Sequence, residues 1–258
     1  MQGQSQDALT LRITSPVADA VSAYASVIDN ATQDPIYIQA VAAPSGQELT
    51  VPVIGRAPGA NGTFWRSDVT FFNPTADRLV LTLRYGSTTR TLALGGRDTE
   101  ILADIVSSFN QSSGSGALLV SWEGSAGPVV TSRTYTTSES GGTFGQSIDP
   151  MGELRSAMYV PGLRNDSSFR SYLGVVNGGD ESENVTFILL YPSGNELARS
   201  TVNVAARTQV QYSVSALFPN VNASAFTLAV EGDANARLFA YGSMVDNASG
   251  DPVFFAGQ

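Results

Sequence analysis

The chain of 258 residues contains no cysteine and no histidine, and all 14 of its basic side chains are arginines, so lysine is absent too. Without histidine or cysteine there is no imidazole base, no thiolate nucleophile and no thiolate metal cluster. Without lysine there is no Schiff base, no Ser-Lys dyad and no phosphate-loop lysine. These absences leave carboxylate chemistry as the one catalytic possibility, and any metal site would need oxygen ligands.

Paired carboxylates across a cleft are the signature of glycosidases. The densest acidic cluster contains Asp180, Glu181 and Glu183, but it falls in the Gly-rich stretch GGDESEN, which is typical of a solvated loop. No acidic residue has a sequence context that predicts burial. We therefore expect no enzymatic activity, no catalytic residues and no cofactor.

Positive charge is also scarce, since the net charge is −9 and the sequence pI is about 4.4. This balance argues against binding to nucleic acid or to an anionic membrane surface. No apolar run approaches 18 residues and no basic-then-apolar leader is present, so we expect no membrane insertion. Hydrophobic residues make up 42% and charged residues only 14%, a composition that favours a secreted β protein with real cores.

A repeated pattern is present in three places. Residues 23–40, AYASVIDNATQDPIYIQA, and residues 240–257, AYGSMVDNASGDPVFFAG, are identical at eight of eighteen positions. A weaker copy at 131–148 keeps a tyrosine, Tyr135, and an aromatic, Phe144. Each copy follows an alternating run that predicts a strand: LTLRIT at 9–14, ALLVSW at 117–122 and FTLAVE at 226–231. We call each predicted three-strand unit a tail module.

A second unit, which we call the front module, occurs twice and begins at residues 51–73 and 159–177. Its aligned pairs are Arg56 with Arg164, Trp65 with Phe169, Arg66 with Arg170, and Asn73 with Asn177. Both copies continue into predicted strands at 79–85 and 185–191 and at 90–94 and 200–204. A short strand and a helical turn follow at 98–109 and 208–218.

One front module and one tail module give about a hundred residues and seven or eight antiparallel strands, which matches an immunoglobulin-like sandwich. The sequence predicts an all-β protein with tandem immunoglobulin-like antiparallel β-sandwiches, preceded by an extra three-strand half-domain. The predicted organisation is residues 1–50 for the surplus tail module and its link, 51–148 for the first sandwich, 149–157 for a linker and 158–258 for the second sandwich.

The surplus tail module at 8–42 has no front module ahead of it in this sequence. A three-strand piece with one apolar face is marginal alone in water, so something must cover it. It can be the remnant of a truncated domain, a segment that completes a sheet on another molecule, or a piece that packs locally. The residues predicted to mediate self-association are Leu9, Leu11, Ile13, Val21, Tyr24, Val27, Ile36 and Ile38.

The runs VPVIGRAPGANGTFWRSDVTFFNP and AYGSMVDNASGDPVFF resemble repeats of large secreted or surface-attached bacterial proteins, most of them uncharacterised. The resemblance covers nearly the whole chain. It implies an immunoglobulin-like fold and an extracellular or cell-surface location, and it offers no catalytic residues to carry over.

Two loops could also bind a cation. Asp29 and Asp34 in the first, and Asp246 and Asp251 in its counterpart, place two carboxylates within a short stretch, as weak Ca²⁺ binding requires. The competing interpretation is an Asx-turn hairpin in which proline starts the next strand. The middle copy lacks these acids and the twelve-residue EF-hand spacing is missing, so we expect no structural metal.

Aromatic and arginine side chains provide the last candidates. Trp65 and Trp122, with Tyr24, Tyr135 and Tyr241, could stack on sugars, but their recurrence at repeat positions favours core roles. For Arg66 and Arg170 we expect hydrogen bonds to loop carbonyls or to an acid such as Asp68.

The sequence therefore predicts an extracellular structural protein that polymerises with itself, head to tail, by β-strand complementation through the N-terminal module. The alternative is a carbohydrate- or matrix-binding adhesion module of a larger secreted protein, with a surface polysaccharide as partner.

Overall fold

The computed structural model describes residues 9–17, 20–44, 46–139 and 141–258. The chain is nearly all β, with 55% of its residues in strands and 4% in helices, and all its sheets are antiparallel, which confirms the all-β prediction. None of the described helices has the length and hydrophobicity that crossing a bilayer requires.

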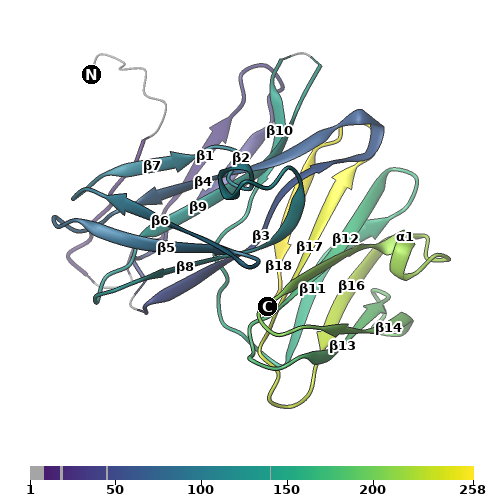
Figure 1. The fold of residues 1–258 in the computed structure, drawn as a ribbon. Coiled ribbons are helices and arrows are strands. Elements are labelled where there is room, and N and C mark those ends of the chain that lie inside the picture. The colour runs from purple at the N-terminus through teal and green to yellow at the C-terminus, as the bar shows by residue number, and fades with distance from the viewer. Residues whose placement is uncertain (1–8, 18–19, 45, 140) are drawn as a thin grey trace.

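The first strand set spans β3 to β10 (Figure 1). Its order is β10-β9-β4-β3-β8-β5-β6, with β7 paired to β4. The long strand β3 bends, because its register against β8 shifts between Val51 and Ile54 and its last residues pair with β4 instead. The elements are β3 (Glu48–Pro58), η1 (Ala60–Gly62), β4 (Phe64–Phe72), β5 (Leu79–Tyr85), β6 (Thr88–Leu94), β7 (Thr99–Leu102), η2 (Ser107–Phe109), β8 (Gly114–Trp122), β9 (Val129–Thr137) and β10 (Thr143–Ser147).

The second strand set spans β11 to β18 and forms two four-stranded sheets, β11-β16-β13-β14 and β15-β12-β17-β18. When the two sets are matched in chain order, from β3 with β11 to β10 with β18, matched strands have the same pairing partners. The one difference is that β3 pairs with β4, whereas β11 and β12 do not pair. The elements are β11 (Ala157–Asn165), β12 (Phe169–Asn177), β13 (Glu183–Leu190), β14 (Glu196–Val204), β15 (Gln209–Ser213), α1 (Val214–Leu217), β16 (Ala223–Glu231), β17 (Leu238–Asp246) and β18 (Pro252–Ala256).

Alternating strand residues build the core. In β5 the exposed fractions of Leu81 and Leu83 are 0%, while the intervening side chains face outward. The two sheets of the second set face each other, since the rings of Phe187 on β13 and Tyr212 on β15 meet edge to face at 6.3 Å. Such packing of apolar faces gives each set a sandwich-like form.

A buried asparagine closes the same loop in both strand sets. Asn73 follows β4, accepts the N–H of Thr75 and donates to the carbonyls of Asp77 (2.7 Å) and Gly95 (2.8 Å). Asn177 is the last residue of β12, accepts the N–H of Gly179 and donates to the carbonyls of Glu181 (2.8 Å) and Val204 (3.1 Å). The side chains thus have the same role at the positions that the sequence aligned, with exposed fractions of 0% and 2%.

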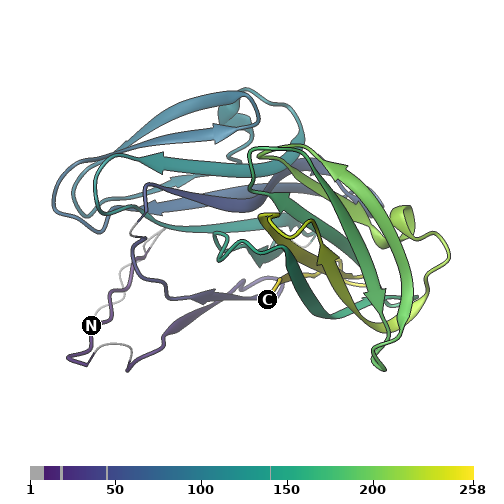
Figure 2. The same ribbon diagram turned by 90° about the horizontal axis from the view of Figure 1, so that it is seen from below.

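The N-terminal segment differs from expectation. Residues 9–14, predicted as a strand, form none, and the only strands described before β3 are β1 (Tyr24–Ile28) and β2 (Pro35–Gln39), which pair in one hairpin. Figure 2 shows this purple segment outside the two strand sets. The prediction at 9–14 was wrong because an alternating pattern forms a strand only where another strand supplies the hydrogen bonds. Strand β3 also begins at Glu48, inside the range 1–50 that was predicted for the surplus tail module and its link.

The asparagine loops give a first prediction. Asn73→Ala and Asn177→Ala should each destabilise the protein by about 1–3 kcal/mol, because buried carbonyls lose their donor. Asn203→Ala, which removes an exposed amide on β14, serves as the control and should change stability by less than about 0.5 kcal/mol. Urea denaturation measures all three. Equal effects for buried and exposed asparagines would contradict the role assigned to the loops.

Candidate functional site

The hairpins β1–β2 and β17–β18 match residue for residue. Tyr24 pairs with Gln39 as Tyr241 pairs with Ala256, and the same spacing continues to Ile28 opposite Pro35 and Val245 opposite Pro252. The aromatic rings also stack alike, Tyr24 on Tyr37 and Tyr241 on Phe254, each at 5.3 Å and 26°. The sequence repeat therefore encodes one hairpin geometry twice.

Both hairpin turns are Asx turns. Asp29 Oδ1 accepts the N–H groups of Ala31 (2.9 Å) and Thr32 (3.1 Å). Asp246 Oδ1 does the same for Ala248 (2.7 Å) and Ser249 (2.8 Å). These bonds stabilise the charged form, so the pKa of Asp246 lies below its usual value. Among the described residues, no three acids gather in a way that could hold a metal ion, and the turn interpretation is favoured over calcium.

The middle hairpin, β9–β10, has a different turn. In the first strand set Thr131 of β9 pairs with Thr70 of β4, and in the second strand set Tyr241 of β17 pairs with Gly174 of β12. Thr70 and Gly174 occupy the same position in the two aligned front modules. The structural counterpart of Tyr24 and Tyr241 is therefore Thr131, and the alignment of Tyr135 with these tyrosines was wrong.

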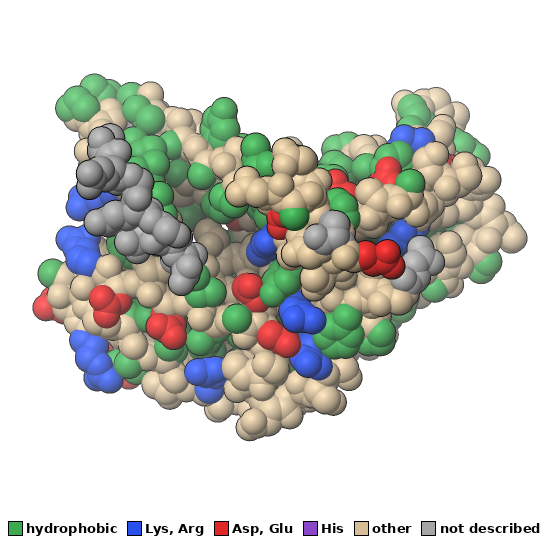
Figure 3. All heavy atoms as spheres, turned by 90° about the horizontal axis from the view of Figure 1, so that it is seen from above, with side chains coloured by type: hydrophobic (Ala, Val, Ile, Leu, Met, Phe, Trp, Pro, Cys, Tyr) green, Lys and Arg blue, Asp and Glu red, His purple; other side chains and the backbone are tan. Residues whose placement is uncertain are grey.

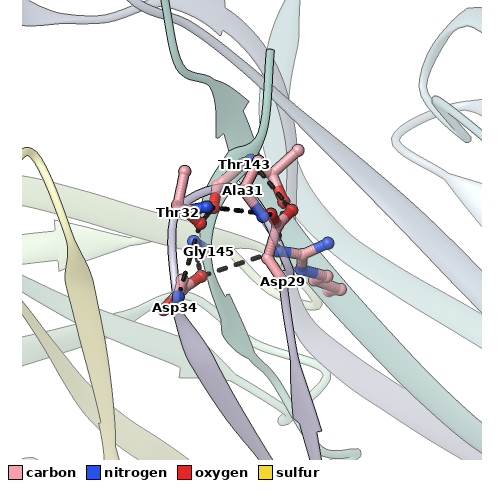
Figure 4. A network of polar contacts seen from close by, with 7 residues as sticks. Asp29, Ala31, Thr32, Asp34, Thr143 and Gly145 are labelled. Carbon is pink, nitrogen blue, oxygen red and sulfur yellow. Dashed lines mark hydrogen bonds and ion pairs between the residues drawn. The ribbon is translucent and has the colours of Figure 1, made fainter. Parts of the chain in front are cut away.

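The turn of the N-terminal hairpin docks on the start of β10 (Figure 4). Asp29 Oδ2 accepts the backbone N–H (3.0 Å) and the hydroxyl (2.8 Å) of Thr143, and the hydroxyl of Thr32 donates to the Thr143 carbonyl at 2.7 Å. The hydrogen bond from the Thr143 hydroxyl makes the largest contribution to lowering the pKa of Asp29, and the hydrogen bonds from the turn N–H groups follow. Gly142 permits this approach, since a Cβ there would lie 2.7 Å from Asp29 Oδ1.

Asp34 is the buried end of the same turn, with an exposed fraction of 4%. Its Oδ2 accepts the N–H of Gly145 at 2.8 Å and lies 3.6 Å from Arg133 Nη2. Asp251 is the repeat counterpart of Asp34. Burial, and then the charge of Asp34, raise the pKa of Asp251 to about 6. The fold thus brings together two acids of corresponding repeat positions.

The residues ahead of this turn are largely exposed, and hydrophobic side chains gather at the upper left of the face in Figure 3. When the alignment of residues 23–40 with residues 240–257 is extended toward the N-terminus without a gap, Leu11, Ile13 and Val21 correspond to Leu228, Val230 and Leu238. These three counterparts are fully buried in the second strand set. Of the residues predicted for self-association, Ile36 is buried in this chain and Ile38 is partly buried. The exposed ones are Leu9 (86%), Leu11 (72%), Ile13 (50%), Val21 (56%), Tyr24 (67%) and Val27 (50%).

The aromatic residues divide between core and surface. Trp122 and Tyr241 are core residues, with exposed fractions of 5% and 0%, whereas Tyr24 lies on the surface. Trp65 is partly buried and lines a cavity of about 200 Å³ between the strand sets, together with Tyr172 and Gln211. The predicted core role therefore fails for Tyr24, because its segment lacks a covering sheet.

The two recurring arginines lie near this region. Arg170 Nη1 donates to Asn247 Oδ1 at 2.8 Å, and Arg170 also lines the cavity. The guanidinium of Arg66 lies over the Phe64 ring at 5.6 Å, and its Nε has no hydrogen-bond partner. The expected partner Asp68 instead accepts the backbone N–H of Asp104, which fixes the loop after β7.

The acidic loop is open to solvent, as its sequence indicates. Asp180 and Glu181 are exposed, and Asp180 pairs with Arg207 at 2.8 Å. Glu183 accepts the backbone N–H of Asp233 at 3.0 Å. These contacts join neighbouring loops.

The chain was compared with known proteins. No protein-family model matches it, and no curated protein matches it. A solved structure from Thermotoga maritima, described as Thermotoga maritima 1070, matches 42% of this chain and 96% of its own length, with 14% identity and a TM-score of 0.35. A similarity this weak carries no argument about fold or function.

The docked turn gives a second prediction. Asp29→Ala should raise the rate of chymotryptic cleavage at Tyr24 and Tyr37 several-fold, because it removes the bonds to Thr143 that hold the hairpin. Asp246→Ala, the matched change in the second hairpin, removes only bonds within its own turn and should leave that rate unchanged. Equal cleavage rates in wild type and Asp29→Ala would show that other contacts hold the hairpin.

A third prediction concerns metal. The oxygens of Asp29 and Asp34 already accept protein N–H and O–H groups, so EDTA or added Ca²⁺ should leave the melting temperature unchanged. Differential scanning calorimetry measures this. A large shift with either reagent would assign the turns to a cation.

Proposed function

We propose that this protein is an extracellular structural protein that self-associates head to tail through its N-terminal segment, residues 9–41. The observation that carries the proposal is that this segment repeats the sequence of β16, β17 and β18 but lacks the strands that cover them. The extracellular location rests on the resemblance of the repeats to those of secreted bacterial proteins and on the weakly charged, polar composition.

The two strand sets are best interpreted as tandem immunoglobulin-like sandwiches. Each pairs its strands in the same order, packs apolar faces together and spans about a hundred residues. In this interpretation β1 and β2 are the last two strands of a third unit, and residues 9–14 are its unpaired strand.

The free energy of the proposed self-association comes from burying apolar side chains of the N-terminal segment that are exposed in the single chain. Burying a leucine, isoleucine or valine side chain contributes about 1.5–3 kcal/mol relative to leaving it in water. Leu11, Ile13 and Val21 keep half or more of their surface in water, whereas their counterparts Leu228, Val230 and Leu238 are fully buried. Association costs oppose the gain, so several side chains must be buried together.

We take a second copy of the chain as the occupant. The turn of the hairpin is fixed against β10, and the Thr10 hydroxyl lies 3.1 Å from the Thr99 hydroxyl of β7, while the side chains of Leu11 and Ile13 remain exposed. Residues 9–14 form no strand, so their backbone can pair with an edge strand such as β14 of a neighbouring molecule. A contact between this segment and a different surface of the next molecule is heterologous, and it repeats into a filament or layer unless it closes a ring.

Binding to a surface polysaccharide is the second candidate function. Its support is the cavity of about 200 Å³, which combines the apolar face of Trp65 with the polar groups of Arg170, Tyr172 and Gln211. A glycan array distinguishes the two functions. Saturable binding to one sugar, lost in a folded Trp65→Ala variant, would support the polysaccharide function.

A fourth prediction tests self-association. Multi-angle light scattering of the full chain should show a mass that grows with concentration. Leu11→Asp/Ile13→Asp should weaken association at least about 100-fold, because it removes about 3 kcal/mol or more of burial at 1.4 kcal/mol per factor of ten. The variant should remain folded, since both side chains are exposed in the single chain.

Val80→Asp is the matched control, because Val80 is an exposed apolar residue (41%) on β5. It should associate like wild type, whereas a variant lacking residues 1–42 should stay monomeric. A full-length chain that is monomeric at high concentration, or double variants that still form fibres, would overturn the proposal.

A further inference from the structure

The cavity beside Trp65 is lined by residues of both strand sets. Trp65 of β4 and Gln146 of β10 belong to the first set, and Arg170 and Tyr172 of β12 and Gln211 of β15 belong to the second. Its volume is about 200 Å³. Sites that hold drug-sized molecules measure roughly 300–1,000 Å³, so this one suits a single ring. Gln211 is exposed, so the cavity is open to solvent on that side.

Two glutamines on the cavity wall have amide N–H groups without a protein acceptor. Gln211 Oε1 accepts the hydroxyl of Tyr241 at 2.9 Å, and Gln146 Oε1 accepts the hydroxyl of Ser243 at 3.0 Å. These bonds occupy the carbonyl end of each amide, and no hydrogen bond among the described residues involves either NH₂ end. The two amides can therefore donate to a bound molecule.

Arg170 gives the cavity a positive charge, and none of the described residues that line the cavity is acidic. Its Nη1 donates to Asn247 Oδ1 at 2.8 Å, while its Nε is buried without a hydrogen-bond partner. The ion pairs of the described residues do not include Arg170. A buried donor without a partner costs free energy, and an acceptor on a ligand would recover it.

Two aromatic side chains supply the apolar part of the wall. Trp65 and Tyr172 are both partly buried, and the Tyr172 hydroxyl has no partner among the described residues. The indole of Trp65 is held in place by close packing, since a Cβ at Gly59 would lie 2.4 Å from its Nε1. Aromatic surface combined with a few fixed polar groups is typical of sites for small organic molecules.

We propose that this cavity binds an acidic sugar, a uronic acid ring at the end of a polysaccharide chain, with its carboxylate at Arg170 and its ring against Trp65 and Tyr172. A carboxylate accepts hydrogen bonds and carries the charge opposite to that of the guanidinium. A neutral sugar could use the amide N–H groups but would leave Arg170 without a counter-charge. The proposal rests on the second candidate function, polysaccharide binding, and does not depend on self-association.

Calorimetric titration of the full chain with glucuronic acid tests the proposal, with glucose as the neutral probe. Glucuronate should saturate one site, bind at least about tenfold more tightly than glucose, and bind more weakly as salt is added. Gln211→Glu should weaken the binding of glucuronate at least about tenfold, because it replaces the free NH₂ group by a negative charge. The fold should persist, since the new carboxylate still accepts the Tyr241 hydroxyl. Gln111→Glu, at an exposed glutamine that does not line the cavity, should bind like wild type.

Tryptophan fluorescence gives a second readout, because the chain has two tryptophans and the other one, Trp122, lies in the core. Glucuronate should change the emission of the wild-type chain. Trp65→Phe, which introduces the residue found at the aligned position 169, should lose this change while Trp122 still reports the fold. Tyr172→Phe removes a hydroxyl that has no partner in the described chain, so it should stay folded and bind glucuronate several-fold more weakly.

An absence of saturable glucuronate binding, or a folded Gln211→Glu variant with wild-type affinity, would overturn the proposal. Glucose that binds as tightly as glucuronate would refute the acidic sugar alone and leave polysaccharide binding in place. A glycan array without any bound sugar would refute both. Self-association is measured separately by mass, so its failure or success is distinguishable from each of these outcomes.

Discussion

The apolar face of a β-sheet has to be covered by a second layer, and this constraint explains most of the structure. In the second strand set the strands β16 and β17 satisfy it, because Leu228 and Leu238 pack under the facing sheet with no exposed surface. The N-terminal segment carries apolar side chains at the corresponding positions, and no strand of the described residues faces them. Its residues 9–14 remain without strand pairing, and Leu11 lies in water. The difference between the two copies comes from the neighbours that each one has.

Local turn chemistry behaves differently from strand pairing. The Asx turns at Asp29 and Asp246 form in both copies because each carboxylate finds its donors within three residues. The N-terminal hairpin is therefore intact although its sheet is incomplete. Its turn then makes contacts that the other copy does not make, with Thr143 and Gly145 of β10. A repeated element has acquired a second role, which is to fix the segment ahead of it on the surface.

Much of this could be predicted from the sequence, where the controlling contacts are local or repeated. The strand at 79–85, the matching turns and the equivalent asparagines Asn73 and Asn177 follow from alternation, Asx-Pro patterns and alignment. The strand at 9–14 could not be excluded, since pairing partners are not visible in an alternating pattern. The effect of the Asp34 charge on Asp251 was also missed, because it depends on how two distant hairpins pack around β10. The acids were noted for their spacing within each loop, and no local signal indicates that the loops meet.

We propose that the apolar residues of the N-terminal segment become covered only in the assembly. Because the chain has no cysteine, a single Leu11→Cys substitution gives a unique thiol at this face, and Val80→Cys gives a matched thiol elsewhere. The measurement is the rate at which each thiol reacts with a soluble maleimide as protein concentration increases. The thiol at position 11 should react rapidly in dilute protein and become protected in concentrated protein, while the thiol at position 80 should stay reactive throughout. Equal reactivity of the thiol at position 11 at every concentration would contradict it.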